Sequence, residues 1–527
     1  MGQAIGIDLG TTYSAVAVAN DALPTILRNR EGENITPSVV MIQGGTAVVG
    51  SQAKRSALSS PDSVVQFVKR KMGEKEVVLV DDQGKQYRAE EISAAILRRL
   101  KEDAEMVLGE SVDSAVITVP AYFDDARRVA TKDAGRMAGL NVLRIINEPT
   151  AAALAYGATH PDGGNLGTVM VFDLGGGTFD VTIMRISGGA FDVLATRGDR
   201  NLGGFDWDNA LMMHLNEQYR ARRGEDLTDD DFLSADLRDK AELAKRTLSL
   251  ATQAVVMLTK ENRTEQIKIT RQEFEELTAK LLLKTERIAE AVLESAKLTW
   301  PDIDEVLLVG GSTRMPMVSD LLERRWGRRP SAGVNQDEAV ALGAALMAFD
   351  EQTRAAQVSE TGSTRSVDVT EQESGSALAT LTKGRVNRIR DVTSQSLGTV
   401  VQDEFSKQMK NRIIIAHDTP LPAKEQGTFA TVSDRQREIE LQVTEGEDED
   451  LQYVRIIGSS DIRVPPYPAG APVEVTYSYD RDAILHVEVK DLTSGKQLGE
   501  FEINRTSNLD EGEIRRMTAE LRQTGIS

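Results

Sequence analysis

The chain has no cysteine and only four histidines in 527 residues. Disulfides, thiolate nucleophiles and cysteine-zinc sites are therefore excluded, and the scattered histidines argue against a histidine-rich metal site. No apolar run approaches the roughly 20 residues that a membrane-spanning helix needs. No charged-then-apolar leader precedes Ile5, which already belongs to an expected strand. The sequence therefore predicts a cytoplasmic protein without a membrane partner.

Positive charge is also scarce, because 62 Lys and Arg face 82 Asp and Glu and leave a net charge of −20. A general nucleic-acid surface needs the opposite balance, so no nucleic-acid partner is expected. The length predicts about three domains.

One stretch organises the first part of the chain. Residues 169–183 read Val-Met-Val-Phe-Asp-Leu-Gly-Gly-Gly-Thr-Phe-Asp-Val-Thr-Ile. The apolar run 169–172 predicts a buried strand ending at Asp173, and the alternation from Asp180 predicts a second strand. The glycines 175–177 are expected to take positive φ and to let the backbone approach a ligand closely. The stretch is thus interpreted as a β-hairpin that folds around a phosphate.

The same design occurs near the N-terminus at residues 5–18, with Asp8 in the place of Asp173. The two aspartates are 173 − 8 = 165 positions apart, which suits a duplicated unit. Neither turn has the lysine of a P-loop or the Gly-x-Gly-x-x-Gly of a dinucleotide fold. Two facing turns with one aspartate each would suit a phosphate tail and a divalent metal.

Up to about residue 350 the pattern alternates between strands and helices, which predicts an α/β domain. A strand at 305–309 runs into Gly310 and Gly311 ahead of a helix, a place that favours a nucleotide in such folds. The expected helices are 91–108, one starting near 124–125, 148–157, 236–250, 317–326 and 338–349, and a further strand is expected at 114–120.

Two features can be interpreted in two ways. Glu148 would ordinarily cap the helix that follows it, although its carboxylate could instead face a neighbouring site. Glu242, Lys245, Arg246 and Ser249 share one helix stripe. That stripe is either a solvated face or a polar shelf for a base and ribose. The residues alone favour the cap and the solvated face.

Composition changes after residue 350. Residues 350–384 are rich in Ser, Thr, Gln, Glu and Gly and predict a flexible connector. From Ser396 onward strand patterns recur at roughly 10-residue intervals, which predicts a β-sandwich. The expected strands are 413–416, 428–432, 439–443, 454–457, 473–479, 484–489 and 501–503, followed by a short helix at 511–522.

The hairpins, the Glu-Pro-Thr helix, the 242–249 stripe and the Gly-Gly-Ser-Thr-Arg turn occur in one order that resembles the 70-kDa heat-shock (DnaK-like) chaperones of the actin-like ATPase superfamily. Agreement is nearly continuous over residues 3–349 and includes 117–123, 147–157 and 172–180. The resemblance implies a two-lobed ATPase domain of duplicated ribonuclease-H-like units, then an all-β peptide-binding sandwich. It implies the boundaries 1–350 for the ATPase domain, 351–391 for the insertion and linker, 392–506 for the sandwich and 507–527 for a residual lid helix.

The family's chemistry, carried over residue by residue, implies hydrolysis of ATP to ADP with Mg²⁺, and K⁺ as a further candidate ion. Asp8 and Asp173 would hold magnesium through water, and Lys69 would stabilise charge on the γ-phosphate. The implied catalytic residues are Asp8, Lys69, Glu148, Asp173, Thr178 and Asp180. The implied nucleotide contacts are Gly10, Thr11, Thr12, Tyr13, Gly175, Gly176, Gly177, Gly203, Gly204, Glu242, Lys245, Arg246, Ser249, Gly310, Gly311, Ser312, Arg314 and Asp337.

The resemblance also implies partners: a J-domain co-chaperone, a GrpE-type nucleotide exchange factor and unfolded polypeptide clients of a monomeric chaperone. Pro120 and Arg128 match an interdomain relay, and Arg144, Asn147 and Asp391 match co-chaperone contacts. The expected walls of a hydrophobic peptide cleft are Phe429, Val432, Ile439 and Leu441. The alternative is that these four are sandwich core residues.

Three departures from the family keep other functions open. The aliphatic linker becomes 386–392 with two arginines, or lies at 366–370 in a second register, so its coupling role is in doubt. The arch at 400–410 is longer and polar, and the helical lid is almost absent. One alternative is an adaptor or holdase for a dedicated partner that uses ATP as a conformational clamp. A second is an actin-like kinase or filament former, against which the β domain argues.

Overall fold

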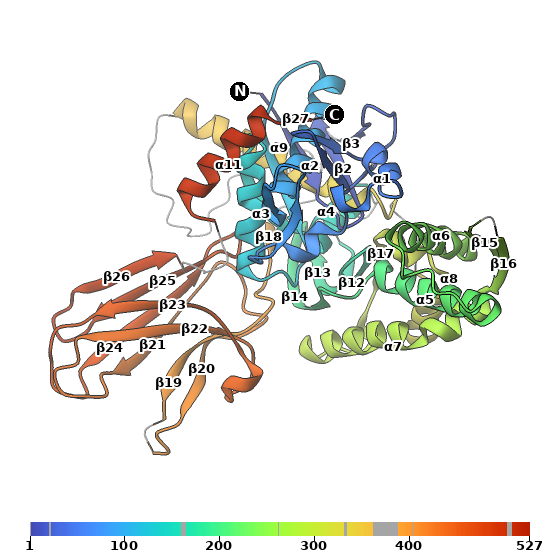
Figure 1. Ribbon diagram of the computed structural model, residues 1–527. Coiled ribbons are helices and arrows are strands. Elements are labelled where there is room, and N and C mark those ends of the chain that lie inside the picture. The colour runs from blue at the N-terminus through green and yellow to red at the C-terminus, as the bar shows by residue number, and fades with distance from the viewer. Residues whose placement is uncertain are drawn as a thin grey trace.

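The computed structural model describes residues 2–20, 23–159, 165–261, 263–330, 335–361, 388–403, 405–502 and 509–526. Figure 1 shows an α/β part, a β-sandwich beside it, and a C-terminal helix that lies against the α/β part. None of the helices in this described portion is both long and apolar enough to cross a membrane.

Sheet A forms the first half of the α/β part, with the strand order β11-β10-β1-β2-β3 and β4 also paired to β2. Strands β1 and β2 are an antiparallel hairpin, and β10 lies parallel to β1 on its other side. The strands are β1 Gln3–Asp8, β2 Tyr13–Asn20, β3 Leu23–Leu27, β4 Thr36–Pro37, β10 Val112–Val119 and β11 Asn141–Asn147.

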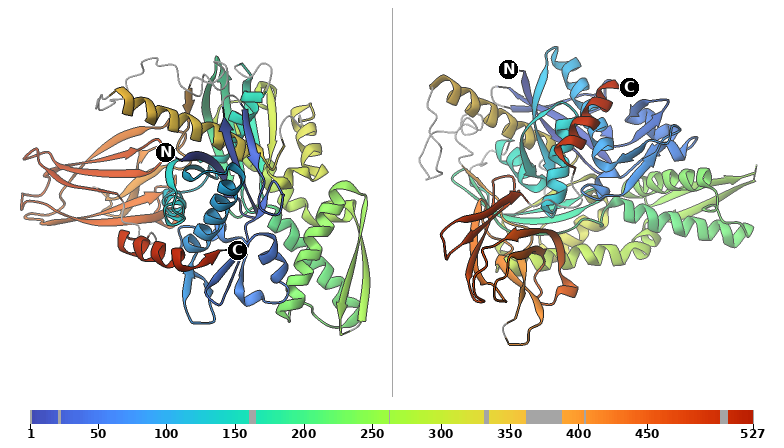
Figure 2. Two further views of the ribbon diagram at one scale, coloured as in Figure 1. Left: turned by 90° about the horizontal axis from the view of Figure 1, so that it is seen from above. Right: turned by 60° about the vertical axis from the view of Figure 1, so that its left-hand side comes forward.

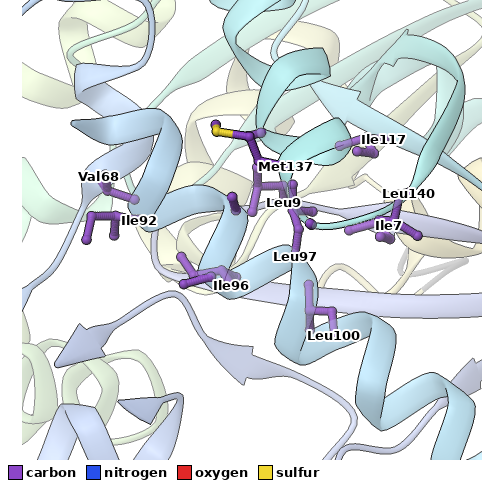
Figure 3. Close-up of a cluster of buried hydrophobic side chains, with 14 of the residues drawn as sticks. Ile7, Leu9, Val68, Ile92, Ile96, Leu97, Leu100, Ile117, Met137 and Leu140 are labelled. Atoms are coloured by element: carbon purple, nitrogen blue, oxygen red, sulfur yellow. The ribbon is translucent and has the colours of Figure 1, made fainter. Parts of the chain in front are cut away.

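Helices α2 (Ala89–Leu108) and α3 (Asp125–Met137) cover sheet A, close to the ranges expected. Asp124 caps α3 by accepting a hydrogen bond from Arg127 N at 3.0 Å. Figure 3 shows aliphatic side chains of α2 near Ile7 and Ile117 of the sheet and Leu9, which follows β1. Smaller elements complete this half, called the A half below: β5 Val40–Gln43, β6 Thr46–Val49, α1 Ser51–Ser56, β7 Val64–Val65, β8 Val77–Val80 and β9 Gln86–Arg88.

Sheet B repeats the pairing of sheet A, in the order β17-β12-β13-β14-β18. Strands β12 and β13 form the antiparallel hairpin expected at 169–183, and β17 lies parallel to β12. The strands are β12 Gly167–Leu174, β13 Phe179–Ser187, β14 Ala190–Asp199, β17 Glu305–Val309 and β18 Arg388–Arg390.

Four helices and a hairpin share one core cluster with sheet B, and this core includes the fully buried Trp207. Together with the sheet they are called the B half. They are α5 Gly204–Arg223, α6 Asp231–Leu250, β15 Gln253–Lys260, β16 Arg263–Thr270, α7 Arg271–Ser295 and α8 Pro316–Trp326.

Two alanine-rich helices, α4 (Glu148–Thr159) and α9 (Ala339–Thr361), lie in one core cluster with residues of both sheets. Small side chains let them cross closely: a Cβ on Gly343 would lie 1.7 Å from Ala151 O. The expected end of the last helix at 349 is wrong, because α9 continues for three further turns into the polar segment. The last turns of α9 are polar, so the sequence did not predict them. They continue a helix whose first turns are stabilised by packing.

The C-terminal domain is the expected sandwich of two four-stranded sheets, β20-β19-β22-β23 and β21-β24-β25-β26. Its core includes the fully buried Tyr477, whose hydroxyl donates to Gly398 O at 3.1 Å. The strands are β19 Leu397–Gln402, β20 Met409–Ile415, β21 Ala423–Ala430, β22 Glu438–Glu445, β23 Arg455–Arg463, β24 Pro472–Tyr479, β25 Leu485–Asp491 and β26 Gln497–Glu502.

The C-terminal helix α11 (Glu511–Gln523) packs on the A half. Ile514 and Met517 are buried in the same core cluster as α2 and α3. Strand β27 (Gly525–Ile526) pairs in parallel with β6.

The sandwich lies beside the α/β part (Figure 2) and contacts it at the start of α3 and on β14 of sheet B. Asp124 Oδ2 lies 3.1 Å from Nη1 of Arg455 in β23, and Asp125 Oδ1 accepts from Leu485 N at 2.9 Å. The two parts are thus docked on each other by polar contacts.

Candidate functional site

A cavity of about 700 Å³ lies where the hairpin turns of sheets A and B meet. The β1–β2 turn lines it from one half, and the β12–β13 turn, α6 and the turn after β17 line it from the other. Of the residues expected at a nucleotide site, it is lined by Asp8, Gly10, Thr11, Thr12, Tyr13, Lys69, Glu148, Asp173, Gly175, Gly176, Thr178, Gly204, Glu242, Lys245, Arg246, Ser249, Gly310, Gly311, Ser312, Arg314 and Asp337. Segments far apart in sequence therefore share one cavity.

The two hairpin turns contact each other beside the cavity. A Cβ on Gly176 would lie 1.8 Å from Thr12 Oγ1, and one on Gly177 would lie 2.4 Å from Thr11 Cγ2. The expectation of positive φ at residues 175–177 is wrong, since none of the three glycines has it. Glycine is needed at residues 176 and 177 because Thr12 and Thr11 of the facing turn occupy the space that a side chain would take.

Carboxyl groups and one ammonium group gather at the inner end. Glu148, Asp173 and Asp180 are buried, and Asp8 is half-buried at the end of β1. The buried Lys69 ammonium donates to Glu148 Oε1 and lies 5.7 Å from the centre of the Phe123 ring. Glu148, the first residue of α4, therefore faces the site.

The pKa values of these carboxyl groups are displaced upward. Removal from water, with repulsion from Glu148, raises the pKa of Asp8 to about 7 and that of Asp180 to about 8. The pKa of Asp173 is raised for the same two reasons. One lysine therefore does not balance the negative charge of the cluster.

The carboxylates Asp8 and Asp173 are suited to a hard divalent cation such as Mg²⁺ that stays coordinated by water molecules. No group of three or more His, Cys, Asp or Glu side chains that could hold a metal ion is found in the described part of the chain. Asp8 and Asp173 instead stand at the ends of corresponding strands, β1 and β12, and both line the cavity. Magnesium retains several waters and takes one or two carboxylates in such sites, and its charge would relieve the repulsion that raises these pKa values.

The outer end of the cavity carries the stripe of α6. Glu242 accepts from Lys54 Nζ at 2.7 Å and pairs with Arg246 at 2.8 Å, while Arg246 Nη2 donates to Tyr13 OH at 2.7 Å. Lys245 pairs with Asp208 at 2.8 Å. The stripe is therefore a wall of the cavity and joins the A half to the B half.

The turn after β17 closes the same end. Ser312 Oγ donates to Gly175 O at 2.9 Å, which ties this turn to the β12–β13 turn. Arg314 Nη2 lies 2.7 Å from Asp337 Oδ2. Gly310, with φ of 80°, makes the bend at the strand end.

Three expected residues do not line the cavity and support it from behind. A Cβ on Gly203 would lie 2.5 Å from Gly177 N, so these two glycines pack against each other. Asp180 Oδ1 accepts from Tyr122 N at 3.1 Å, beneath the carboxyl cluster.

Sequence reasoning missed several supporting residues. Arg70 donates to Gly177 O at 3.0 Å and to Asp206 Oδ2 at 2.6 Å, and Thr118 Oγ1 donates to Asp8 at 3.4 Å. Lys54 makes the contact across the cavity described above. Of these residues only Arg70 could have been suspected from the sequence, because it follows Lys69 directly. Thr118 and Lys54 belong to distant segments and to no motif.

The expected relay and co-chaperone residues cluster near the sandwich. Arg128 Nη2 donates to Asn147 Oδ1 at 2.6 Å, and Pro120 O accepts from Phe123 N at 3.1 Å. Arg144 Nη2 donates to Arg481 O at 2.9 Å, and Asp391 accepts from Thr150 Oγ1 at 2.7 Å. Arg144 is thus engaged by the sandwich in this arrangement, and its role toward a co-chaperone stays a prediction.

The described residues 388–390 of the expected linker are docked in spite of their arginines. Strand β18 pairs in parallel with β14, and Ile389 packs on the core between the sheets. Arg388 Nη2 reaches Asp192 Oδ2 at 2.8 Å, so an ion pair stands where an aliphatic contact was expected. The second possible register at 366–370 lies outside the described residues.

The four expected cleft residues differ in their surroundings. Leu441 is buried in the sandwich core, Phe429 and Ile439 are half-buried against it, and Val432 is 66% exposed. The Arg412 guanidinium lies 5.2 Å from the centre of the Phe429 ring. In the β19–β20 loop Phe405 is 94% exposed. Their role in a peptide cleft stays a prediction.

Comparison with protein families gives one match over almost the whole chain. The family model described as "Hsp70 protein" matches residues 4–351 and 375–525, which take in the α/β part, the sandwich and α11. The chain therefore belongs to the Hsp70 protein family, a family of chaperones whose members bind and hydrolyse ATP.

Proposed function

We propose that this protein is an ATP-hydrolysing chaperone whose nucleotide state regulates the binding of extended hydrophobic peptides in the sandwich. The observation that carries the proposal is the cavity, in which two glycine turns, Lys69 and the carboxyl cluster meet. In this proposal the A and B halves are the two lobes of an actin-like ATPase domain in the cytoplasm.

Different parts of the cavity would bind different parts of ATP. The α6 stripe and the turn after β17 would hold the adenosine, and the backbone of the two hairpin turns would hold the phosphates. Lys69 would offset charge that develops on the γ-phosphate, which is the main requirement of phosphoryl transfer to water. Glu148, whose carboxyl group adjoins Lys69, would orient the attacking water, and Asp180, held by Tyr122 N beneath the cluster, would help to order the water shell of the metal. Bound magnesium would neutralise phosphate charge.

Partners are part of the same proposal. The family generally works with J-domain proteins, nucleotide exchange factors and unfolded clients. Here Arg144, Asn147 and Asp391, which adjoin the sandwich and the linker, would form the co-chaperone contact.

The catalytic assignment is tested by Lys69→Ala. ATP hydrolysis should fall at least about 100-fold while ATP binding changes little, because the ammonium acts mainly on charge in the transition state. Single-turnover hydrolysis and equilibrium binding of labelled ATP measure the two quantities. Lys71→Ala is the matched control, since Lys71 pairs with Glu76 at the surface. Normal hydrolysis by the Lys69 variant would overturn the assignment.

A holdase or adaptor with ATP as a clamp remains the second candidate. Arg412 over Phe429, the exposed Phe405 and the arginine-bearing linker favour it, because they alter the surface that a generic peptide would meet. Fluorescence anisotropy with generic hydrophobic peptides separates the two. Affinity that changes several-fold between ADP and ATP supports the chaperone, and no binding with either nucleotide supports a dedicated partner.

A further inference from the structure

An arginine of α3 shares an aromatic neighbour with Lys69. Lys69 Nζ lies 5.7 Å from the centre of the Phe123 ring, and the guanidinium carbon of Arg127 lies 5.9 Å from the same centre. All three residues are buried. One buried ring therefore has the ammonium group of Lys69 and the guanidinium group of Arg127 as neighbours.

Arg127 also contacts the turn to which Lys69 belongs. Its Nη2 donates to Glu74 Oε1 at 3.0 Å, and Glu74 lies just after the 3-10 helix Val68–Lys71 that contains Lys69. The backbone of this turn is close to α3 as well, since a Cβ on Gly73 would lie 3.1 Å from Arg127 N. The side chain and the backbone of Arg127 thus both contact the segment that carries Lys69.

Asp124 orients the guanidinium from the other side. Arg127 Nη1 donates to Asp124 Oδ2 at 2.6 Å, and the Asp124 side chain is fully buried. The guanidinium is planar and its N–H groups have fixed directions, so two carboxylate partners on different nitrogens leave it little freedom to rotate. Arg127 is therefore held rigidly between its own helix and Glu74 of the turn.

The position of the Lys69 ammonium decides what it can do in hydrolysis. Lys69 Nζ donates to Glu148 Oε1, so it has a carboxylate and the Phe123 ring as neighbours. Misplacing a reacting group by about 1 Å can cost on the order of 100-fold in rate, even when the cause lies elsewhere in the protein. Loss of Arg127 would release the ring and the turn together and would shift the ammonium relative to the γ-phosphate.

We propose that Arg127 is a positioning residue that fixes the Lys69 ammonium for ATP hydrolysis, through the Phe123 ring and through Glu74. The proposal rests on the catalytic role that the proposed function gives to Lys69. Arg127 itself does not line the cavity, so it acts through Lys69 and not on the nucleotide.

Arg127→Met in the full chain tests this role, because methionine keeps an apolar contact with the ring and removes both ion pairs. Single-turnover ATP hydrolysis should fall about ten-fold, while the dissociation constant of labelled ATP changes less than about two-fold. Arg127→Lys keeps one positive charge and should remain about three-fold below the parent, since lysine lacks the planar fork. In the Lys69→Ala chain, Arg127→Met should cause no further fall, because residues that act as one unit are not additive.

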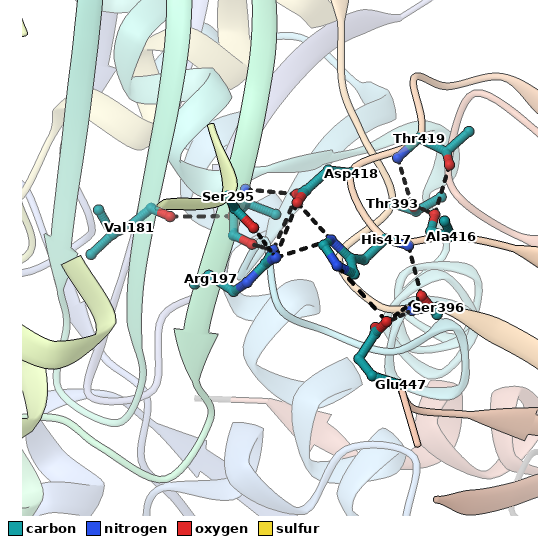
Figure 4. A network of polar contacts seen from close by, with 11 residues as sticks. Val181, Arg197, Ser295, Thr393, Ser396, Ala416, His417, Asp418, Thr419 and Glu447 are labelled. Atoms are coloured by element: carbon teal, nitrogen blue, oxygen red, sulfur yellow. Dashed lines mark hydrogen bonds and ion pairs between the residues drawn. The ribbon is translucent and has the colours of Figure 1, made fainter. Parts of the chain in front are cut away.

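The sandwich offers a competing explanation, because Arg455 Nη1 also lies 3.1 Å from Asp124 Oδ2. Arg455→Met separates the two. It leaves Arg127 with both carboxylates, and the sandwich is still held on β14, where Figure 4 shows Asp418 against Arg197, with Arg197 Nη1 donating to Asp418 Oδ1 at 3.1 Å. Hydrolysis by Arg455→Met should stay within about two-fold of the parent. A ten-fold fall in this variant would overturn the proposal, because docking of the sandwich would then position the lysine.

Arg136→Met is the matched control on the same helix, since Arg136 pairs with Asp133 and with Glu511. It should keep the parent rate. Hydrogen exchange at residues 68–74 without nucleotide should be faster in Arg127→Met than in this control, a result that does not depend on turnover. A parent rate in Arg127→Met, or a ten-fold fall that persists in the Lys69→Ala chain, would overturn the positioning role alone. Normal hydrolysis by Lys69→Ala would instead overturn the proposed function, and the role of Arg127 with it.

Discussion

Asp180 is buried, and the cations near it do not fully offset the cost of ionising its carboxyl group. Its residue is 1% exposed, and its pKa is raised to about 8 by burial and by Glu148. An unfolded aspartate ionises near pH 4. Between these values the unfolded chain loses this proton and the folded chain keeps it, so rising pH costs folding stability.

Asp180→Asn should therefore flatten the pH dependence of stability in the nucleotide-free protein. The amide oxygen can still accept from Tyr122 N, so the fold should survive. Between about pH 5 and about pH 8 the variant should lose less unfolding free energy than the parent, by on the order of a few kcal/mol. Urea titrations at several pH values measure this. A variant that loses as much as the parent would show that Asp180 ionises normally in the fold.

Lys54 shows what a single long side chain does across the cavity. It extends from α1 of the A half to Glu242 of the B half, 2.7 Å away, and both side chains are about four-fifths buried, at 23% and 18% exposure. The pair bridges the A half and the B half beside the cavity wall that Glu242 forms.

Lys54→Met should speed the release of bound ADP about five-fold, because loss of a partly buried ion pair costs about 1 kcal/mol in the closed form. Stopped-flow displacement of a fluorescent ADP analogue measures the rate. Lys71→Met removes an ion pair of 2.5 Å at an exposed site and should leave the rate unchanged. Equal release from parent and Lys54→Met would mean that this contact does not limit opening.

Helix α11 illustrates how an element can belong to a core distant from it in sequence. Met517 is 7% exposed and lies in the same cluster as Ile92 and Met137 of the A half. Main-chain pairing of β27 with β6 and the Lys85–Glu520 ion pair of 2.7 Å add to this attachment.

Met517→Ala should lower the unfolding free energy of the A half by about 2–3 kcal/mol, the cost of removing a large buried side chain at the edge of a core. Hydrogen exchange in α2 and α3 should become faster in the same variant. Arg515→Ala, at an exposed position of the same helix, should change neither quantity. Unchanged exchange in Met517→Ala would mean that α11 does not stabilise the A half.

Elements were predictable where the signal is local. Both hairpins, the α6 stripe and seven of the eight sandwich strands follow from periodicity and turn residues that lie within one short window, whereas β19 was not among the expected strands. The end of α9 at Thr361 and the attachment of α11 were not, because they depend on packing partners far away in the chain. The glycines of the β12–β13 turn were correctly singled out for the wrong reason, since close packing on Thr11 and Thr12 requires them and φ does not.

The residues of the candidate site also differ in whether a local sequence motif contains them. Residues in contiguous motifs, such as Asp8 and Asp173, could be placed from sequence, and the family resemblance added Lys69. Thr118, Lys54 and Tyr122 reach the site singly, through contacts that only the folded chain creates. No sequence window contains such information.

The relative position of the α/β part and the sandwich is set by an interface with many polar contacts. Arg455, Arg144 and Arg197 each cross or flank the boundary between the α/β part and the sandwich. Polar interfaces within one chain favour relative motion of the domains. The linker strand β18 adds main-chain pairing and the apolar contact of Ile389 to these charges.

Ile389→Asp should therefore release the sandwich from the α/β part. A carboxylate at this half-buried position would have to leave water beside the core between the sheets, which opposes the pairing of β18 with β14. The polar contacts that remain are individually weak, so they should not hold the domains together alone. Small-angle scattering should show a larger radius of gyration, and hydrogen exchange at 388–390 should rise. Ser459→Asp adds the same charge at an exposed position of β23 and should leave the scattering curve of the parent. If Ile389→Asp stays as compact as that control, the arginine contacts suffice for docking and the linker strand is dispensable.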